Sequence, residues 1–311
     1  MEDSSVSCAE HLAQYFSEKD NSENVVLSSV VPEICKTEKC CLGVDEAGRG
    51  PVLGPMVYGV AYCPLDKSDA LKKLGCADSK VLTEEKREEL FGKLCEGKDY
   101  VGWSVEVIAP NSICNSMLRR QKYSLNQVSH DSAIGLIKKA VEAGVNISEV
   151  YVDTVGPADK YQEKLSKIFP DFKITVASKA DATYPCVSAA SICAKVSRDR
   201  ALQVWKFEDG IDKPAEGWGS GYPNDPVTKK FLQQNIDPIF GFPHMVRMSW
   251  STADKILESS ATTVEWEEED EEASPGTPSI TSFFGSSKTK KSRTQHPFFK
   301  ERNLAPTASL N

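Results

Sequence analysis

The stretch Cys41-Leu-Gly-Val-Asp-Glu-Ala-Gly-Arg-Gly-Pro-Val-Leu-Gly-Pro-Met-Val-Tyr58 decides the fold of this chain. Its apolar start, Cys41–Val44, is typical of a buried strand, and the apolar run Met56–Cys63 predicts the partner strand of a hairpin. Between them, Gly48-Arg49-Gly50-Pro51 is a turn signal in which glycines allow close approach of the backbone. Because side chains alternate along a strand, the adjacent acids Asp45-Glu46 would face opposite sides unless the strand ends there.

Two interpretations of this acid pair stay open at this point. Charge normally remains exposed, so the acids could be solvated residues at the end of a strand. A carboxylate at the end of an interior strand is costly unless a cation compensates it. The glycine loop favours a functional role, because it offers backbone N–H groups to a polyanion beside the acids.

Length and composition indicate an ordinary globular protein. The 311 residues suffice for one large domain or two, and 40% hydrophobic with 26% charged residues allows a sizeable core. No apolar run is long enough to span a bilayer, and the N-terminus lacks the basic start and apolar stretch of a signal peptide. The ten cysteines form no Cys-x-x-Cys motif and the four histidines are scattered, so we expect no zinc site and a reducing compartment.

The formal charge of −8 argues at first against a nucleic-acid partner. Much of the acid, however, is concentrated in residues 265–272. Basic residues are clustered as well, in Arg119-Arg120-Gln-Lys122, Lys138-Lys139, Lys195 with Arg198 and Arg200, and Lys229-Lys230. The net charge therefore permits a basic groove of the kind that a phosphate backbone requires, although charge runs are usually solvated faces.

Helix and strand patterns alternate along the rest of the chain. Thr83 is a typical N-cap and Gly144 a typical helix end. The patterns predict a weak helix around His11–Phe16, the hairpin of residues 41–63, a helix from Thr83, a strand at Tyr100–Ala109, a helix at Tyr123–Ala143, a strand ending at Asp153, a helix at Asp159–Phe169, a strand at Lys173–Ala177, a helix after Pro185, a glycine- and proline-rich loop at Gly217–Pro226 and a short helix at Thr228–Asn235.

We expect three regions in this chain. Residues 1–40 are polar and predict a partly ordered N-terminal extension, whereas residues 41–260 carry the globular domain. Residues 261–311 combine the acidic run, Ser274-Pro-Gly-Thr-Pro278 and a basic Ser/Thr-rich segment. This low-complexity composition predicts a disordered tail.

Three predicted strand ends carry carboxylates: Asp45 with Glu46, then Asp153, then Asp181. Carboxylates on neighbouring strands would repel one another, and Mg²⁺ or Mn²⁺ would remove that repulsion because hard cations take oxygen ligands. Such a cluster suits phosphoryl transfer, in which two metals about 3.5–4 Å apart activate a water and stabilise the leaving oxygen. The sequence alone does not establish that the strand ends converge.

These motifs together resemble the signature of the type 2 ribonuclease H family, also called ribonuclease HII. The resemblance covers roughly residues 41–250, and the length and tail are most similar to the catalytic subunits of eukaryotic members. The matching motifs are Asp45-Glu-Ala-Gly-Arg-Gly-Pro51, Asp78-Ser-Lys80, Tyr151-Val-Asp-Thr-Val-Gly156, Lys179-Ala-Asp181, Ser188-Ala-Ala-Ser-Ile192 and Gly219-Ser-Gly-Tyr-Pro-Asn-Asp-Pro226.

The resemblance implies an α/β fold: a ribonuclease H-like mixed sheet, its first three strands antiparallel, flanked by helices and followed by a helical C-terminal part. It implies an endonuclease that hydrolyses the RNA strand of RNA/DNA hybrids and nicks at single ribonucleotides in duplex DNA, acting in ribonucleotide excision repair and removal of RNA primers. Location in the nucleus and assembly with two non-catalytic partner subunits are also implied.

The resemblance further implies site residues. The expected metal ligands are Asp45, Glu46, Asp153 and Asp181, holding Mg²⁺ or Mn²⁺ as a two-metal site. The expected substrate contacts are Gly48, Arg49 and Gly50 with the ribose 2′-OH, Tyr222 with the junction to the following deoxynucleotide, and Lys80 and Arg198 with the phosphate backbone. A salt bridge on a helix surface is an equal alternative for Arg198, and loop packing is an alternative for Tyr222.

Two rival classes remain: a non-catalytic protein that binds hybrids, and another metal-dependent nuclease on the same fold that cuts DNA. The four acids disfavour the first, because without cations they would repel phosphates. The Gly48–Gly50 loop with Tyr222 disfavours the second, because it gives a reason to need a 2′-OH.

The tail offers a further hypothesis. Ile280 and Phe283-Phe284 have the spacing of a box that binds a sliding clamp, but Thr277 stands where glutamine is usual. Docking on a clamp, docking on one of the partner subunits and no function all remain open. The missing glutamine favours the partner subunits.

Overall fold

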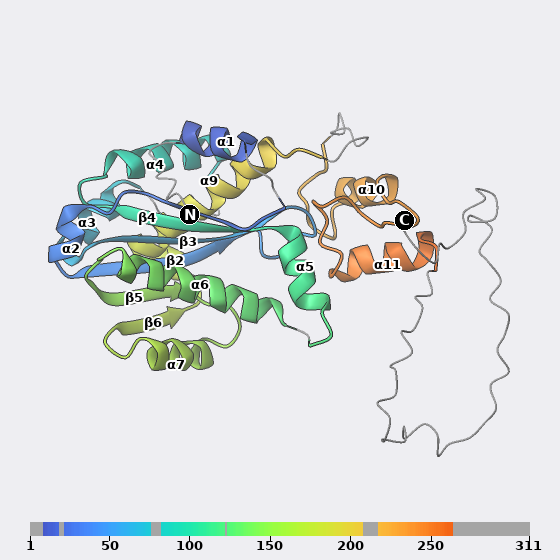
Figure 1. Cartoon of the computed structure of the whole chain (residues 1–311). Coiled ribbons are helices and arrows are strands. Elements are labelled where there is room, and N and C mark those ends of the chain that lie inside the picture. Colours follow the sequence, from blue (N-terminus) through green and yellow to red (C-terminus); the bar gives the residue numbers. More distant parts are fainter. Residues whose placement is uncertain (1–8, 19–21, 76–81, 122, 208–216, 264–311) are drawn as a thin grey trace, which may run out of the picture. The chain divides into compact units, whose positions relative to one another are not determined.

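The computed structural model describes residues 9–18, 22–75, 82–121, 123–207 and 217–263. Figure 1 shows a mixed six-stranded sheet, in the order β1-β4-β3-β2-β5-β6, between layers of helices. Its strands are β1 (Val25–Ser28), β2 (Cys40–Ala47), β3 (Met56–Pro64), β4 (Gly102–Ile108), β5 (Ile147–Asp153) and β6 (Lys173–Ala177). The helices are α1 (Ala9–Glu18), α2 (Glu33–Thr37), α3 (Ser68–Lys73), α4 (Glu84–Glu96), α5 (Pro110–Leu118), α6 (Leu125–Glu142), α7 (Ala158–Ile168), α8 (Ala180–Thr183), α9 (Pro185–Gln203), α10 (Pro226–Gln234), α11 (Ser251–Ser260) and the 3-10 helix Leu65–Lys67.

Strand β2 is central and joins the two halves of the sheet. It pairs antiparallel with β3, which pairs antiparallel with β4, as expected for the first strands of the domain. On its other side β2 pairs parallel with β5, and β5 pairs parallel with β6. The β2–β5 register ends at Val44 opposite Val152, so the next residues, Asp45 and Asp153, lie on adjacent strands at one end of the sheet.

Helix α9 packs unusually close to the sheet. A Cβ on Gly43 would lie 2.2 Å from backbone atoms of Cys186 and Val187, and a Cβ on Gly59 would lie 2.6 Å from the Ala190 carbonyl oxygen. Helix α9 therefore packs with its backbone directly against β2 and β3. This contact places the part of α9 that carries Ser191 and Lys195 beside Asp45.

Two hydrophobic cores cover the two faces of the sheet. On one face, α9 packs with α1 and α4 around Trp103 and Phe91. On the other face, α6 and α7 bury residues such as Ile137 and Leu165. A third core joins α10 and α11 to the turn after β2, where Leu53 forms a bridge with Val246. The helical C-terminal part thus packs on the segment that links β2 to β3.

The predicted elements from the hairpin to the helix after Asp225 are present, with small changes in their bounds. Thr83 caps α4 by accepting a hydrogen bond from Lys86 N, and Gly144 adopts φ +89° just after α6. The local pattern predicts no strand before residue 41, yet β1 pairs with β4 from Val25 to Ser28. Helices α3, α5 and α11 also have no clear local signal, because short helices depend on tertiary packing more than on local pattern.

One prediction about the acids needs correction. Asp181 does not end a strand: β6 ends at Ala177, and Asp181 lies in the first turn of α8, which follows Lys179 in the left-handed region at φ 56°. Asp45 and Glu46 also lie within β2, which continues to Ala47. The expected contact of Lys80, the motif around it and the tail after residue 263 fall outside the described residues.

Among the helices that the structure describes, we find none with the length and apolar character needed to cross a bilayer.

Candidate active site

A cavity of about 630 Å³ opens at the end of the sheet where β2 extends beyond β5. Strand β2, the loop after it, β5, α4, α9 and the loop before α10 all contribute to its wall. The lining residues are Asp45, Glu46, Ala47, Gly48, Arg49, Gly50, Arg87, Asp153, Lys195, Arg198, Asp199 and Tyr222. The structure therefore brings together eight of the predicted site residues, from Asp45 to Tyr222, in one groove. Asp181 is not part of its wall.

Asp45 is a buried carboxylate that faces α9. Burial raises its pKa to about 6, a hydrogen bond from Ser191 opposes the rise, and the charge of Asp153 adds to it. Lys195, one helical turn after Ser191, donates to the Ser191 hydroxyl at 2.8 Å and lowers the pKa of Asp45 through its charge. The site thus holds a carboxylate at a position where its negative charge is only partly compensated.

Glu46 faces the opposite side of the sheet. Its charge raises the pKa of Tyr161 and that of Tyr58, after the larger effect of burial on both phenols, and these phenols belong to the core under α6 and α7. The alternation expected from the sequence is therefore observed. It separates the Asp45 and Glu46 side chains, although both reach the cavity at the end of the sheet.

Asp153 and Asp181 are linked through one backbone group. The Ala180 N–H donates to Asp153 Oδ1 at 2.9 Å, and the next residue, Asp181, is only 3% exposed. Within the described residues, no three His, Cys, Asp or Glu side chains form a preassembled metal site. The role of all four acids as metal ligands accordingly stays a prediction.

The donor set nevertheless fits a hard divalent cation. Asp45 and Asp153 are adjacent carboxylates, and oxygen ligands are those that Mg²⁺ and Mn²⁺ prefer. The raised pKa of Asp45 reports burial and repulsion that a cation between the two acids would relieve.

Arg247 holds the Gly48–Gly50 loop from behind. This fully buried arginine donates to the carbonyl oxygens of Gly48 at 2.7 Å, Arg49 at 3.1 Å and Gly54 at 2.8 Å. Burial and the nearby Arg198 lower its pKa to about 9. Trp250, whose ring lies 4.9 Å from the guanidinium carbon, donates from Nε1 to the Gly50 carbonyl at 3.0 Å.

These contacts orient the peptides of the loop. In a trans peptide the N–H points opposite to the preceding C=O. Since the carbonyls of Gly48 and Arg49 point to Arg247, the N–H groups of Arg49 and Gly50 point away from it. The loop also lines the cavity that contains the carboxylates.

The two glycines are required for different contacts. Gly48 has φ +71°, and a Cβ there would lie 1.9 Å from Arg198 Nε. A Cβ on Gly50 would lie 3.1 Å from the Tyr222 ring. Glycine therefore lets Arg198 and Tyr222 approach the loop backbone.

Tyr222 is 52% exposed at the rim of the cavity, on a loop that several hydrogen bonds fix. The Gly221 carbonyl accepts from Val52 N at 2.7 Å, and Gly221 N donates to Thr228 Oγ1 at 3.0 Å. Asp225, which caps α10, also accepts from Ser220 N at 2.6 Å. A half-exposed ring on a rigid loop is suited to stacking on a ligand.

Arg198 contacts backbone carbonyls rather than an acidic side chain. It donates to the carbonyls of Pro55 at 3.1 Å and Leu53 at 3.2 Å, and thereby fixes the turn after the glycine loop. The groove also contains two basic side chains, Arg87 and Lys195, that are not among the predicted site residues. Arg87 pairs with Asp199 at 2.8 Å, and Lys195 lies beside Asp45.

Arg247 is the most consequential residue that sequence reasoning missed. Its only signal is a charged residue within the mostly apolar stretch Phe242–Met248, and charged side chains are rarely buried without a partner. The partners are backbone carbonyls almost two hundred residues away, which no local pattern can reveal.

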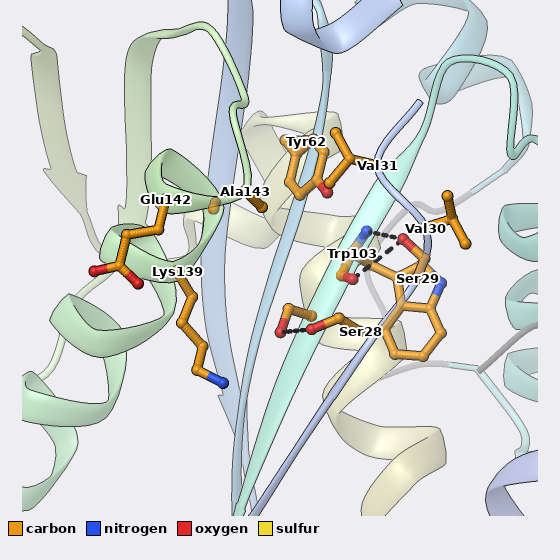
Figure 2. Close-up of a pocket in the computed structure, with 11 residues that line it drawn as sticks. Ser28, Ser29, Val30, Val31, Tyr62, Trp103, Lys139, Glu142 and Ala143 are labelled. Carbon is orange, nitrogen blue, oxygen red and sulfur yellow. Dashed lines mark hydrogen bonds between the residues drawn. The ribbon is translucent and has the colours of Figure 1, made fainter. Parts of the chain in front are cut away.

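A second hollow, of about 430 Å³, lies near the far end of α6 (Figure 2). It is lined by Ser28–Val31, Tyr62, Trp103, Ser104 and the last turns of α6, including Lys139 and Glu142. Its hydroxyls are engaged by the protein, because Ser28 and Ser104 share a 2.8 Å hydrogen bond and Ser29 bonds the Trp103 backbone. Glu142 is the one acid among its lining residues, so this hollow does not offer a site for paired metal ions.

Comparison with known proteins agrees with this geometry. The Ribonuclease HII family matches residues 42–253. The chain is 52% identical over 293 residues to a ribonuclease H2 subunit of Bos taurus, covering 94% of this chain and 98% of that protein.

Solved structures show the same fold. The ribonuclease H2 of Pyrococcus horikoshii OT3 is 34% identical, with a TM-score of 0.57 and coverage of 71% of this chain and 98% of that one. The ribonuclease HII of a PCNA:RNase HII complex from Archaeoglobus fulgidus is 29% identical, with a TM-score of 0.55 and coverage of 70% and 96%. The chain belongs to the ribonuclease HII family and is an enzyme of the ribonuclease H class, an endonuclease that hydrolyses phosphodiester bonds.

Proposed function

We propose that this enzyme hydrolyses the RNA strand of RNA/DNA hybrids and nicks duplex DNA at single embedded ribonucleotides, with Mg²⁺ or Mn²⁺ held as a two-metal site. The observation that carries the proposal is the Gly48–Gly50 loop beside the adjacent carboxylates Asp45 and Asp153. The carboxylates can bind the divalent cations that phosphodiester hydrolysis needs, and the backbone of the loop can hydrogen-bond to the 2′-OH of a ribose.

The N–H groups of Arg49 and Gly50, which point away from Arg247, are the proposed donors for the 2′-OH of the ribonucleotide. A ribose hydroxyl can accept such a bond, and a deoxyribose has nothing to place there. Arg247 and Trp250 hold the loop in this orientation through its carbonyls, so little ordering is needed when substrate binds.

Tyr222 takes the sugar or base that follows the ribonucleotide. Its ring lies 3.1 Å from where a Cβ on Gly50 would be, so the loop and the tyrosine together would read the 2′-OH and the neighbouring nucleotide. Arg198 supports this arrangement by donating to the carbonyls of Leu53 and Pro55 in the turn after the loop. We also propose that Arg198 or Lys80 contacts a phosphate of the substrate directly.

Asp45, Glu46, Asp153 and Asp181 are the proposed metal ligands. When bound there, two divalent cations supply a water nucleophile and stabilise the leaving oxygen. The protein contributes the placement of Asp45 beside Asp153, the Ala180 N–H that orients Asp153, and the Ser191–Lys195 pair that orients Asp45.

The direct test is cleavage of matched duplexes. The protein is incubated with duplex DNA that carries one ribonucleotide, with an RNA/DNA hybrid and with all-DNA duplex, in Mg²⁺, in Mn²⁺ and in EDTA. We expect nicking of the first two substrates with either metal and none in EDTA. Cutting of all-DNA duplex would identify a DNA nuclease, and tight binding without cleavage under every condition would identify a non-catalytic binder of hybrids.

For partners, we propose two non-catalytic subunits, a location in the nucleus and roles in ribonucleotide excision repair and primer removal. The bovine relative is named as one subunit of its enzyme, which supports an assembly, and the archaeal complex with PCNA supports a sliding clamp as a further partner. We favour the tail after residue 263 as a contact with the partner subunits, since Thr277 replaces the usual glutamine of a clamp box.

A chain that ends at Thr262 tests the tail. We expect it to retain cleavage chemistry but to co-purify less with the partner subunits than the full chain does. Undiminished assembly would contradict the assignment to the partner subunits. Micromolar binding of a peptide spanning residues 273–290 to the clamp, about −8 kcal/mol, would assign the tail to the clamp instead.

A further inference from the structure

The α5–α6 turn, which comprises Leu118, Arg119, Arg120 and Gln121, is an exposed basic segment that the proposed chemistry does not use. All four side chains are exposed. The turn belongs to one of the basic clusters found in the sequence, and its position relative to the groove is visible only in the structure. Both of its flanks are tied to the loop that lines the cavity.

The flank on α5 is tied through the C-terminal part. Ser249 donates from its hydroxyl to Met117 Sδ at 3.6 Å and to Cys114 Sγ at 3.9 Å. The next residue, Trp250, donates to the carbonyl of Gly50 in the glycine loop. The end of α5 therefore lies close to the backbone that would read the ribose.

The flank on α6 is tied directly to the loop. Asn126, in the first turn of α6, accepts a hydrogen bond from Arg49. A capping box between Ser124 and Gln127 fixes the start of the helix. The turn is thus held between two anchors that both reach the Gly48–Gly50 loop.

The turn also has local order. The Arg119 guanidinium carbon lies 4.7 Å from the centre of the Tyr123 ring, and Arg119 Nε donates to the Gln121 carbonyl at 2.9 Å. Tyr123 N donates to the Ser116 carbonyl at 3.1 Å, and its hydroxyl donates to Asp131. Stacking on an aromatic ring orders a guanidinium while its terminal N–H groups can still meet an anion at a defined place.

A duplex in the groove must pass over neighbouring surfaces. One turn of duplex is about 34 Å long, and it carries phosphates on both strands along its whole length. The cavity of about 630 Å³ takes only the nucleotides at the reaction centre. The surfaces rigidly joined to the glycine loop, such as the α5–α6 turn, are where the adjoining arm of the duplex would lie.

We propose that the α5–α6 turn binds the phosphate backbone of one duplex arm of the substrate through Arg119 and Arg120. This inference rests on the proposed function, because it assumes that a ribonucleotide-containing duplex enters the groove. The contact is electrostatic and independent of sequence, so it sets affinity and the position of the duplex but not the chemical step.

The test compares Arg119→Gln/Arg120→Gln with Lys138→Gln/Lys139→Gln in the full chain, assembled with its partner subunits if these are required for activity. The second variant removes the same charge near the other end of α6. Binding to a 30-base-pair duplex with one central ribonucleotide is measured over a range of salt in an Asp153→Asn background. Single-turnover cleavage is measured in the wild-type background.

We expect the arginine variant to bind several-fold more weakly and to lower the magnitude of the slope of log K against log salt by about 1–2. The rate at saturating substrate should not change. The lysine variant should match the wild type, and Arg119→Lys/Arg120→Lys should restore most of the slope. Trimming one duplex arm should abolish the difference between arginine variant and wild type, whereas trimming the other should preserve it.

An unchanged slope in the arginine variant would overturn the inference, as would a difference that survives trimming of either arm. Loss of assembly with the partner subunits at an unchanged slope would assign the turn to a protein contact and would also overturn it. If the wild type neither binds nor cleaves the ribonucleotide duplex, the proposed function fails instead, so the two failures are distinguishable.

Discussion

The start of helix α6 contacts the loop that lines one hollow, and its end lines a second hollow of different chemistry. At its start, Asn126 accepts a hydrogen bond from Arg49, which lines the cavity that contains the adjacent carboxylates of two parallel strands. At its end, Lys139 and Glu142 line the hollow in Figure 2, whose serines bond one another or the backbone. Volume therefore does not identify the active site. Adjacent carboxylates mark the candidate active site instead, because their mutual repulsion costs folding free energy that a purely structural role would not require.

Substitution at the groove should have the largest effect. Asp153→Asn removes a carboxylate beside Asp45, and loss of several kcal/mol of charge stabilisation should reduce cleavage about 10³-fold or more. The fold should persist, because the amide can still accept from Ala180 N. Single-turnover cleavage and circular dichroism measure both effects. Glu142→Gln in the second hollow is the matched control. Near-wild-type turnover of Asp153→Asn at saturating Mg²⁺ would contradict the assignment of the chemistry to the groove.

Arg247→Met tests the support behind the glycine loop. It would leave the buried carbonyl of Gly54 and the partly buried carbonyls of Gly48 and Arg49 without their donor, at about 1–3 kcal/mol for each fully buried group. We expect the free energy of unfolding to fall by about 3 kcal/mol or more and kcat/KM on embedded ribonucleotides to fall as well. Denaturant unfolding supplies the measurement. Arg200→Met, which removes a partly exposed pair with Glu88, should cost no more than about 1 kcal/mol.

The raised pKa of Asp45 predicts a dependence of stability on pH. An acid whose pKa rises from 3.8 to about 6 on folding is protonated in both states below about pH 4, so it has no effect there, and its ionisation destabilises the folded state increasingly as the pH rises to 6 and above. In EDTA, Asp45→Asn should therefore be more stable than the wild type at pH 8, by up to about 3 kcal/mol. The gain should disappear as the pH falls to 4. A difference that is constant from pH 4 to pH 8 would show that the charge of Asp45 is not responsible.

Tyr222→Ala should weaken recognition of the embedded ribonucleotide more than binding to long hybrid, which offers many backbone contacts. Stacking on an aromatic ring is worth about 1–3 kcal/mol, so discrimination should fall by about 5- to 150-fold. Tyr222→Phe keeps the ring and separates stacking from hydrogen bonding. Equal losses on both substrates would instead favour a role in packing the loop.

The smallest effect is expected in the second hollow. Ser28→Ala removes one partner of the Ser28–Ser104 hydrogen bond and should lower the free energy of unfolding by about 0.5–1.5 kcal/mol. Cleavage should remain within about twofold of the wild type in the single-turnover assay. A large loss of activity would mean that the second hollow affects catalysis in the groove. The contrast between the two ends of α6 would then no longer hold.

Much of the local structure was predictable from short patterns. The hairpin follows from two apolar runs around Gly48–Pro51, α4 from the cap at Thr83, and the end of α6 from Gly144. These features depend on backbone conformation and capping, which act over a few residues. The opposite directions of Asp45 and Glu46 also follow from the alternation of a strand.

The sequence by itself determined which residues could carry the chemistry: carboxylates near strand ends, a glycine loop and a tyrosine in a glycine- and proline-rich loop. Only the tertiary structure decided which of them meet. Parallel pairing of β2 with β5 places Asp45 beside Asp153, and a buried Arg247, 199 residues from Gly48, holds the backbone of the glycine loop. Such contacts depend on register and on close packing between distant segments, and neither leaves a signal within the short stretches where propensity acts.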